Sequence, residues 1–173
     1  MKVLITGING QDGSYLSELL LERGHRVHGI LKRNSVAENQ SARIEHIFKD
    51  LELEYADMLD MASLIRVIQL VKPDEIYNLA SQSHVRISFD QPIYTSQVVG
   101  LGVLNLLESV RLTDKNIKVY QASSSEMFGN SMDEDGFQRE TTHMHPASPY
   151  GCAKVYAYNI CCNYRNAYDM YIS

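Results

Sequence analysis

The sequence has few cysteines, and they all lie late in the chain. They are Cys152, Cys161 and Cys162. An odd number of cysteines in one region provides no disulfide framework and fits a reducing compartment. The first residues also lack the apolar stretch and the small-residue cleavage site of a signal peptide. We therefore expect a cytoplasmic protein.

Long apolar runs and an excess of one charge are missing as well. No run of about 18 apolar residues occurs, so the sequence predicts no membrane span. The net charge is −5 with both signs mixed along the chain, which argues against binding to nucleic acids or to anionic membranes. No metal site is expected, because His143 and His145 form the only tempting pair, without the further ligands that a tetrahedral ion needs.

The sequence does contain strand-length apolar runs that alternate with helical stretches. Apolar residues make up 45% of the 173 residues, enough for one core. The predicted strands are 2–6, 26–31, 53–57, 75–80 and 117–123, with a further start at 170–173. The predicted helices are 15–24, 42–50, 61–71, 93–111 and 149–167. This alternation predicts an α/β fold with a doubly wound parallel sheet, whose ligands bind beyond the carboxyl ends of the strands.

A glycine-rich loop lies between the first predicted strand and the first predicted helix. It reads TGINGQDGSYL and contains Gly7, Gly10 and Gly13. Glycine lets the backbone turn tightly and bring its N–H groups close to a pyrophosphate, and a helix N-terminus adds a partial positive charge. Its place between a strand and a helix predicts a dinucleotide site. An ordinary glycine-rich turn is the alternative.

The residues after the second predicted strand indicate which dinucleotide is bound. NAD sites usually carry an acid there, which holds the ribose 2′-hydroxyl. This chain has Lys32 and Arg33 instead. Because cationic side chains bind a 2′-phosphate, the sequence predicts NADP as the cofactor; a solvated basic loop is the alternative. Asp57, with Met58 beside it, ends the third predicted strand and is a candidate for the adenine edge.

Two motifs could carry chemistry at the same edge of the sheet. Tyr150 and Lys154 lie four residues apart and share one helix face. A nearby ammonium favours the phenolate, which could remove a proton from a sugar hydroxyl. Ser124 and Glu126 follow the fifth predicted strand, where they could bond a substrate oxygen and transfer a proton. The alternatives are an exposed Tyr–Lys pair and a helix cap with a solvated acid.

These motifs together resemble the extended short-chain dehydrogenase/reductase family. The longer segments are similar to the GDP-mannose 4,6-dehydratases within it, namely TGINGQDGSYLSELLLERGH, PDEIYNLASQSHVRISFDQPIYT, YQASSSEMFG and SPYGCAKVYAY. The resemblance covers essentially the whole chain. It implies an NADP-binding Rossmann domain over residues 1–173 and a lyase of nucleotide-sugar metabolism, acting in deoxysugar biosynthesis.

The resemblance also implies a reaction. GDP-mannose would be the substrate and GDP-4-keto-6-deoxymannose the product. Tyr150, helped by Lys154, would deprotonate the C4 hydroxyl while hydride passes to NADP+, and Ser124 would lie near the C4 oxygen. Glu126 would remove the C5 proton as water leaves C6, and the hydride would return to C6.

Further positions are assigned only by the resemblance. Arg33 matches an arginine at the adenine ribose phosphate, and Arg43 lies in a loop through which subunits of this family form tetramers, so a homodimer or homotetramer is expected. Cys161 and Cys162 would pack in a helical interface between subunits. The implied cofactor-binding residues are Gly7, Gly10, Gln11, Asp12, Gly13, Arg33, Asp57, Met58, Leu79, Ala80, Ser83, Tyr94, Tyr150 and Lys154. His84, in the loop on the nicotinamide side, is equally a contact or a structural histidine.

The length of the chain departs from this family. Its members are about twice as long, so the resemblance implies that the C-terminal substrate domain is missing and that residues 1–173 are a truncated cofactor domain. Two alternatives stay open. The chain could come from another nucleotide-sugar dehydratase or epimerase, for instance one acting on a GDP-heptose, or it could be a non-catalytic NADP-binding fragment.

Overall fold

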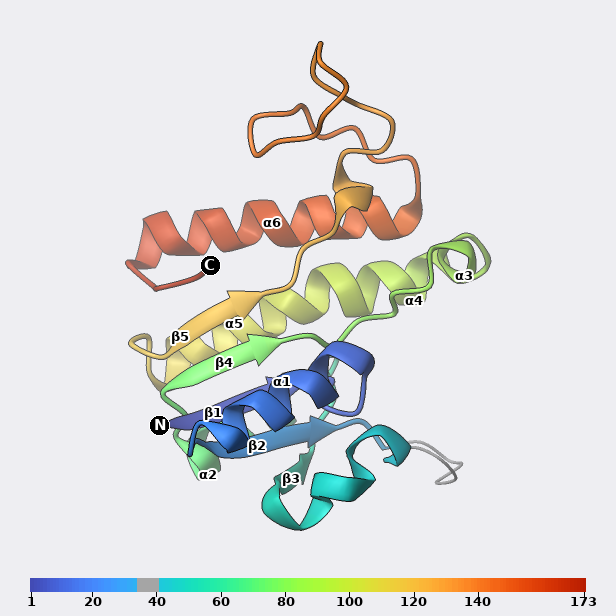
Figure 1. The fold of residues 1–173 in the computed structure, drawn as a ribbon. Helices are drawn as coiled ribbons and strands as arrows, with labels where there is room; N and C mark the ends of the chain where they lie inside the picture. Colours follow the sequence, from blue (N-terminus) through green and yellow to red (C-terminus); the bar gives the residue numbers. More distant parts are fainter. Residues whose placement is uncertain (34–40) are drawn as a thin grey trace.

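A single parallel sheet forms the centre of the protein (Figure 1). The structure, a computed structural model, describes residues 1–33 and 41–173. The strand order is β3-β2-β1-β4-β5. The strands are β1 (Lys2–Thr6), β2 (Arg26–Leu31), β3 (Glu52–Tyr55), β4 (Glu75–Asn78) and β5 (Lys118–Gln121). The order reverses between β1 and β4, which confirms the doubly wound sheet and places a binding crevice at their carboxyl ends.

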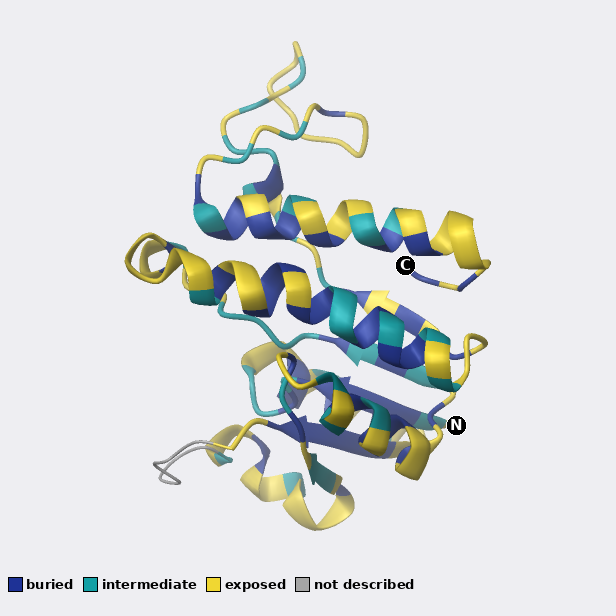
Figure 2. Cartoon of the chain, turned by 180° about the vertical axis from the view of Figure 1, so that it is seen from behind, coloured by how far each residue is buried: buried dark blue, intermediate teal, exposed yellow. Residues whose placement is uncertain are grey.

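Helices cover both faces of this sheet. They are α1 (Gln11–Glu22), α2 (Met61–Val71), α3 (Val85–Asp90), α4 (Pro92–Ser96), α5 (Gly102–Thr113) and α6 (Pro149–Tyr168), with 3₁₀ turns η1 (Ala42–Asp50) and η3 (Ser125–Met127) and a π turn η2 (Gln97–Leu101). One core joins α2, α5 and α6 to the sheet, and a second lies under α1 and η1. The buried residues follow the helix sides that face the sheet (Figure 2).

Most predicted elements agree with the structure, and the differences arise from tertiary packing. The predicted helix 93–111 is present as α4, η2 and α5, with a π turn that contains Gly100. A Cβ on Gly100 would lie 3.3 Å from Cδ1 of Tyr156, so α6 packs closely there. The short helix α3 was not predicted. The strand start predicted at 170–173 forms one parallel bridge, between Val119 and Ile172. A polar loop is also predicted to begin at Lys32; residues 34–40 of it lie outside the described residues.

One helix has the length and composition of a membrane span. It is the continuous helix Pro92–Thr113, the one such helix in the described part of the chain. Within the protein, 56% of an 18-residue stretch of this helix is buried, and α5 packs against α2 and α6. Its apolar character is therefore accounted for by the core that it helps to form.

The cysteines also differ in part from expectation. Cys161 is 5% exposed and belongs to the core that α6 forms with the sheet. Its side chain is therefore buried within one chain and not on a surface open to a second subunit. Burial raises the pKa of its thiol to about 12, which makes it unreactive. Cys162 is half-buried and Cys152 is exposed.

Candidate dinucleotide and catalytic site

Two glycines between β1 and the first turn of α1 have no space for a Cβ. Gly7 has φ +69°, and a Cβ there would lie 2.9 Å from the backbone N of Ala80. A Cβ on Gly13 would lie 2.4 Å from the carbonyl oxygen of Gly7. The N-cap of α1 is Gly10, which has no side chain to accept hydrogen bonds from the first turn. The loop therefore suits a phosphate group that approaches the backbone N–H groups.

Buried polar side chains join the carboxyl ends of three strands. The Thr6 hydroxyl donates to Oδ1 of Asn78, and Nδ2 of Asn78 donates to Oε1 of Gln121 at 2.6 Å. Nε2 of Gln121 donates to the carbonyl oxygen of Ala122 at 2.8 Å, and the same oxygen accepts from Nζ of Lys154 at 2.8 Å. Sequence reasoning missed Thr6 and Asn78 as part of the site. Their signal was a polar residue that directly follows apolar residues of a strand.

The predicted pair Tyr150 and Lys154 lies in the first turns of α6. Ser148 caps this helix, and its Oγ accepts from the backbone N of Gly151 at 3.0 Å. Tyr150 is 6% exposed and Lys154 is 4% exposed. Nζ of Lys154 lies 5.7 Å from the centroid of the Tyr150 ring. Burial lowers the pKa of Lys154 to about 8. The pair is therefore a buried one, and the alternative of an exposed Tyr–Lys pair is excluded.

A cavity of about 400 Å³ brings the glycine loop and this pair together. Its lining combines the phosphate loop, the ends of β4 and β5, and the start of α6. These residues are Gly7, Asn9, Gly10, Gln11, Asp12, Gly13, Leu79, Ala80, Ser81, Ser83, Ala122, Ser123, Tyr150 and Lys154. Groups that were predicted from separate motifs thus share one space.

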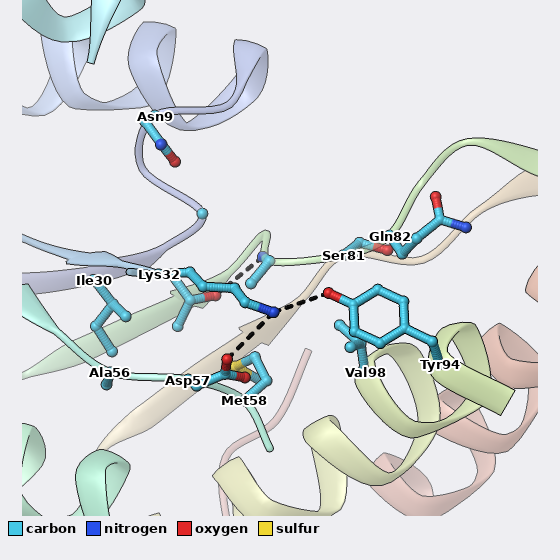
Figure 3. Close-up of a pocket in the computed structure, with 13 residues that line it drawn as sticks. Asn9, Ile30, Lys32, Ala56, Asp57, Met58, Ser81, Gln82, Tyr94 and Val98 are labelled. Carbon is cyan, nitrogen blue, oxygen red and sulfur yellow. Dashed lines mark hydrogen bonds and ion pairs between the residues drawn. The ribbon is translucent and has the colours of Figure 1, made fainter. Parts of the chain in front are cut away.

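A second cavity of about 320 Å³ also borders the loop (Figure 3). Its lining residues are Thr6, Gly7, Asn9, Ile30, Lys32, Ala56, Asp57, Met58, Ala80, Ser81, Gln82, Tyr94 and Val98. Asp57, Met58 and Tyr94 are predicted cofactor residues that meet here. Arg33 is exposed and is not in the lining of either cavity. Its neighbour Lys32 lines the second cavity instead.

The Ser124–Glu126 turn lies against the start of α6. Oγ of Ser124 accepts from the backbone N of Glu126 at 3.2 Å and caps η3. Oγ of Ser148 donates to Oε2 of Glu126 at 3.3 Å. A Cβ on Gly151 would lie 2.6 Å from the carbonyl oxygen of Glu126. The structure thus brings this turn next to the Tyr150 helix, although neither Ser124 nor Glu126 lines the two cavities.

Three histidines were considered in the sequence analysis, namely His84, His143 and His145. His84 caps α3, where its Nδ1 accepts from the backbone N of Ile87 at 3.4 Å, in keeping with a structural histidine. The rings of His143 and His145 lie 6.3 Å apart. Within residues 1–33 and 41–173, no group of three or more His, Cys, Asp or Glu side chains is arranged to hold a metal ion.

The parallel sheet, the glycine loop at its switch point and the cavities on both sides define a Rossmann-type α/β protein of the short-chain dehydrogenase/reductase class. The family profile described as "GDP-mannose 4,6 dehydratase" matches residues 4–173. The chain therefore belongs to the GDP-mannose 4,6-dehydratase family.

Relatives and solved structures agree with this assignment. The chain is 48% identical to a GDP-mannose 4,6 dehydratase of Drosophila melanogaster, over 97% of this chain and 44% of the relative. It is 49% identical to a GDP-mannose 4,6-dehydratase of Vibrio cholerae, over 98% of this chain and 47% of the relative. The fold matches a Thermus thermophilus UDP-glucose 4-epimerase in complex with NAD, with a TM-score of 0.86, 26% identity, and coverage of 99% of this chain and 53% of that one. The chain spans about half the length of the curated relatives that it matches.

Proposed function

We propose that this chain is the NADP-binding part of a GDP-mannose 4,6-dehydratase, which converts GDP-mannose to GDP-4-keto-6-deoxymannose. One observation carries the proposal. A single cavity contains both the glycine loop and the buried pair Tyr150 and Lys154. A phosphate-binding loop next to a proton-transfer pair fits a nicotinamide-dependent reaction on a sugar hydroxyl.

The described residues fit a nicotinamide dinucleotide. The loop at Gly7 and Gly13 leaves a cradle that a Cβ would fill, and α1 begins there with an uncapped first turn. The basic residues Lys32 and Arg33 follow β2, where an acid would favour NAD, and this supports NADP. When bound, the nicotinamide ring supplies a hydride acceptor and, later, a hydride donor.

Tyr150 takes the proton of the C4 hydroxyl in this proposal. Its ring is fixed by burial, with Val99 and Ala153 packed around it. The Lys154 ammonium favours the phenolate form of a tyrosine beside it. With a pKa near 8, Lys154 is largely charged at neutral pH, so burial does not remove this effect. Ser124 donates a hydrogen bond to the C4 oxygen.

Glu126 transfers the second proton. Once C4 is a ketone, the C5–H bond is acidic enough for a carboxylate to remove its proton. The electron pair of that bond then expels the C6 hydroxyl, which leaves as water with the proton carried by Glu126. Ser148 orients this carboxylate through its hydrogen bond to Oε2. When hydride returns to C6, C5 takes up one proton from solvent, and Tyr150 releases the proton of the C4 hydroxyl to solvent.

The proposal also includes the oligomeric state and the cellular location of the enzyme. The family resemblance supports a homodimer or homotetramer, and the cysteine content supports a cytoplasmic location. The sugar nucleotide would need contacts beyond those of this cofactor domain. Light scattering on the purified chain tests the oligomeric state.

Calorimetric titration of the 173-residue chain with NADP+, NAD+ and GDP-mannose tests the central proposal. We expect binding of NADP+ that is tighter than binding of NAD+, and weak or undetectable binding of GDP-mannose. NADP+ binding supports an intact cofactor domain. A chain that is folded by circular dichroism and binds neither dinucleotide contradicts the proposal, and the motifs would then reflect ancestry alone.

A further inference from the structure

A row of buried hydrogen bonds runs from Thr6 to Lys154, the lysine of the buried pair. Its two middle side chains are Asn78, which is 1% exposed, and Gln121, which is 8% exposed. Nδ2 of Asn78 donates to Oε1 of Gln121 at 2.6 Å. Neither side chain is among the described lining residues of the two cavities. Any effect of these two amides on a bound ligand must therefore pass through other groups.

The two ends of this row fix the direction in which each amide points. Two backbone N–H groups that follow β4 donate to the Thr6 hydroxyl oxygen at 3.2 and 3.1 Å. The Thr6 hydroxyl then donates its one proton to Oδ1 of Asn78. At the other end the carbonyl oxygen of Ala122 can only accept, so Gln121 turns its NH2 group toward it. Every donor in the row thus points toward Ala122, and hydrogen bonds in such a row strengthen one another.

The row meets Lys154 at the carbonyl oxygen of Ala122. Ala122 lies one residue beyond β5 and lines the 400 Å³ cavity. Its oxygen accepts from Nε2 of Gln121 and from Nζ of Lys154, each at 2.8 Å, which uses both lone pairs of a carbonyl oxygen. Because Lys154 is 4% exposed, water does not replace this acceptor. The direction of one carbonyl group therefore decides where the buried ammonium points.

The place of this ammonium matters for Tyr150. Nζ of Lys154 lies 5.7 Å from the centroid of the Tyr150 ring, and charges act strongly over such a distance in a buried site. Burial lowers the pKa of Lys154 to about 8, and Cys161 opposes this effect. No carboxylate of the described residues is among the groups that shift this pKa. The hydrogen bond to Ala122 is thus the contact that holds the charge in place.

We propose that Gln121 is a positioning residue for Lys154. Together with the two side chains that precede it in the row, Gln121 fixes the carbonyl oxygen of Ala122. This oxygen holds the Lys154 ammonium beside Tyr150. The catalytic consequence rests on the proposed function, because it requires Tyr150 to act as the base. The position of the ammonium is a property of the chain without ligands, and it can be tested separately.

NMR titration of the 173-residue chain with isotope-labelled lysine tests this position. The signals of Lys154 are identified by their loss in Lys154→Arg. Gln121→Met removes the amide and keeps an unbranched side chain of similar length. We expect the pKa of Lys154 to fall by about one pH unit in this variant, because the ammonium loses an ordered acceptor that the neutral amine needs less. An unchanged pKa would overturn the inference.

Asn105 offers a matched control on α5. Its Nδ2 donates to the backbone carbonyl oxygen of Met58 at 2.8 Å, which is the same kind of bond, at the same length, as the one from Gln121 to Ala122. Asn105 is not among the described lining residues of either cavity. Asn105→Leu should change the pKa of Lys154 by less than about 0.3 pH units. An equal fall in both variants would mean that any lost amide loosens the protein, and would overturn the inference.

Thr6 provides a second test, which decides the matter if Gln121→Met does not fold. Valine is close to threonine in shape and favours strands, so Thr6→Val removes the hydroxyl at the far end of the row with little change in packing. We expect it to lower the pKa of Lys154 by about half a pH unit. Thr6→Ser keeps the hydroxyl and should restore the wild-type value. In that case, a wild-type value in Thr6→Val would overturn the inference.

The effect on catalysis is measured in a version of the chain extended by the second half of a relative. With its ammonium displaced, Lys154 favours the Tyr150 phenolate less. We therefore expect Gln121→Met to lower turnover of GDP-mannose about 10-fold at pH 7 and to move the acid limb of the pH profile up by about one pH unit. NADP+ affinity should change by less than about 3-fold, because Gln121 does not line the cavity.

The two readouts separate the inference from the proposed function. Lower turnover with an unshifted pH profile would mean that Gln121 supports only the fold, and would overturn the inference. An extended wild type that shows no turnover, in a chain whose Lys154 titrates as expected, would contradict the proposed function alone. The position of the ammonium would then stand as a property of the fold.

Discussion

Arg33 and Lys32 follow β2 as neighbours, yet only Lys32 lines the 320 Å³ cavity. Arg33 is exposed, and its guanidinium suits direct, bidentate contact with a phosphate. We expect Arg33→Ala to weaken NADP+ binding about 10-fold more than NAD+ binding. Calorimetry of both dinucleotides measures it, and equal losses would remove the 2′-phosphate role from Arg33.

The Tyr150 hydroxyl can be removed without disturbing the core. Phenylalanine keeps the ring that packs with Val99 and Ala153. In a version of the chain extended by the second half of a relative, we expect Tyr150→Phe to lower GDP-mannose turnover at least about 100-fold. NADP+ affinity should stay nearly constant. Turnover assays and titration on the same protein check this, and retained turnover would mean that another group is the base.

The burial of the charged Lys154 side chain lowers the free energy of unfolding. Burial lowers its pKa to about 8, which corresponds to roughly 3 kcal/mol against the charged form. Lys154→Met removes this cost but also the hydrogen bond to Ala122, worth about 1 kcal/mol. We therefore expect the variant to be about 1–2 kcal/mol more stable at pH 7 in urea denaturation.

The pH dependence distinguishes this cause from better packing. Above the pKa that Lys154 has in the unfolded chain, the amine is neutral in both states and its burial costs no stability. As the pH falls through the lower pKa of the folded state, the folded protein comes to bury a charge, and stability is lost. The advantage of Lys154→Met should be largest below pH 8 and shrink as pH rises toward 10. An advantage that does not change with pH would contradict this explanation. Lys118→Met, at an exposed lysine, is the control.

At the scale of elements, Ser148 links the start of α6 to the Glu126 turn. Its Oγ caps the helix at Gly151 and also donates to Glu126. Loss of such a cap costs about 1 kcal/mol. Asp60 caps α2 in the same way, through the backbone N of Ala62 and Ser63, but lies outside both cavities. The two alanine variants should therefore lose similar stability.

Only the Ser148→Ala variant should affect chemistry. In the extended version of the protein, we expect it to lower turnover about 10-fold, because the Glu126 carboxylate loses its orienting partner. Asp60→Ala should leave turnover unchanged. Denaturation midpoints and turnover numbers of both variants check this. An equal effect on turnover would mean that helix stability, and not the contact with Glu126, is responsible.

The elements could be predicted where each one carries its own signal. Residues 2–6, 26–31 and 61–71 form a strand, a strand and a helix with the expected bounds, because apolar periodicity and flanking Gly or Pro residues mark them. The helix α3 and the π turn η2 could not be predicted, since they depend on contacts with α6. The same holds for the site. The motifs gave Gly7 and Tyr150, but the meeting of Lys32 with Tyr94 joins residues 62 positions apart and is visible only after folding.

For the whole molecule, the cavities connect elements that are distant in sequence. Residues after β1, β2, β3, β4 and β5 line one or the other. A ligand that binds only the folded chain stabilises it by about 2.7 kcal/mol at 100 times its dissociation constant. We expect saturating NADP+ to raise the melting temperature by about 5–10 °C. Differential scanning fluorimetry measures this, with NAD+ at equal concentration giving a smaller shift. No shift with either dinucleotide would argue against a shared binding groove.

The two cavities share only Gly7, Asn9, Ala80 and Ser81 among their described lining residues. Lys32, Asp57 and Tyr94 lie on the β2–β3 side, whereas Tyr150 and Lys154 lie on the β5 side. Changes at well-separated positions generally add. Natural variation could therefore retune the choice of redox carrier on one side of the sheet while the acid–base groups on the other side stay untouched. The reversal of strand order thus gives the protein two halves that can vary separately around one shared loop.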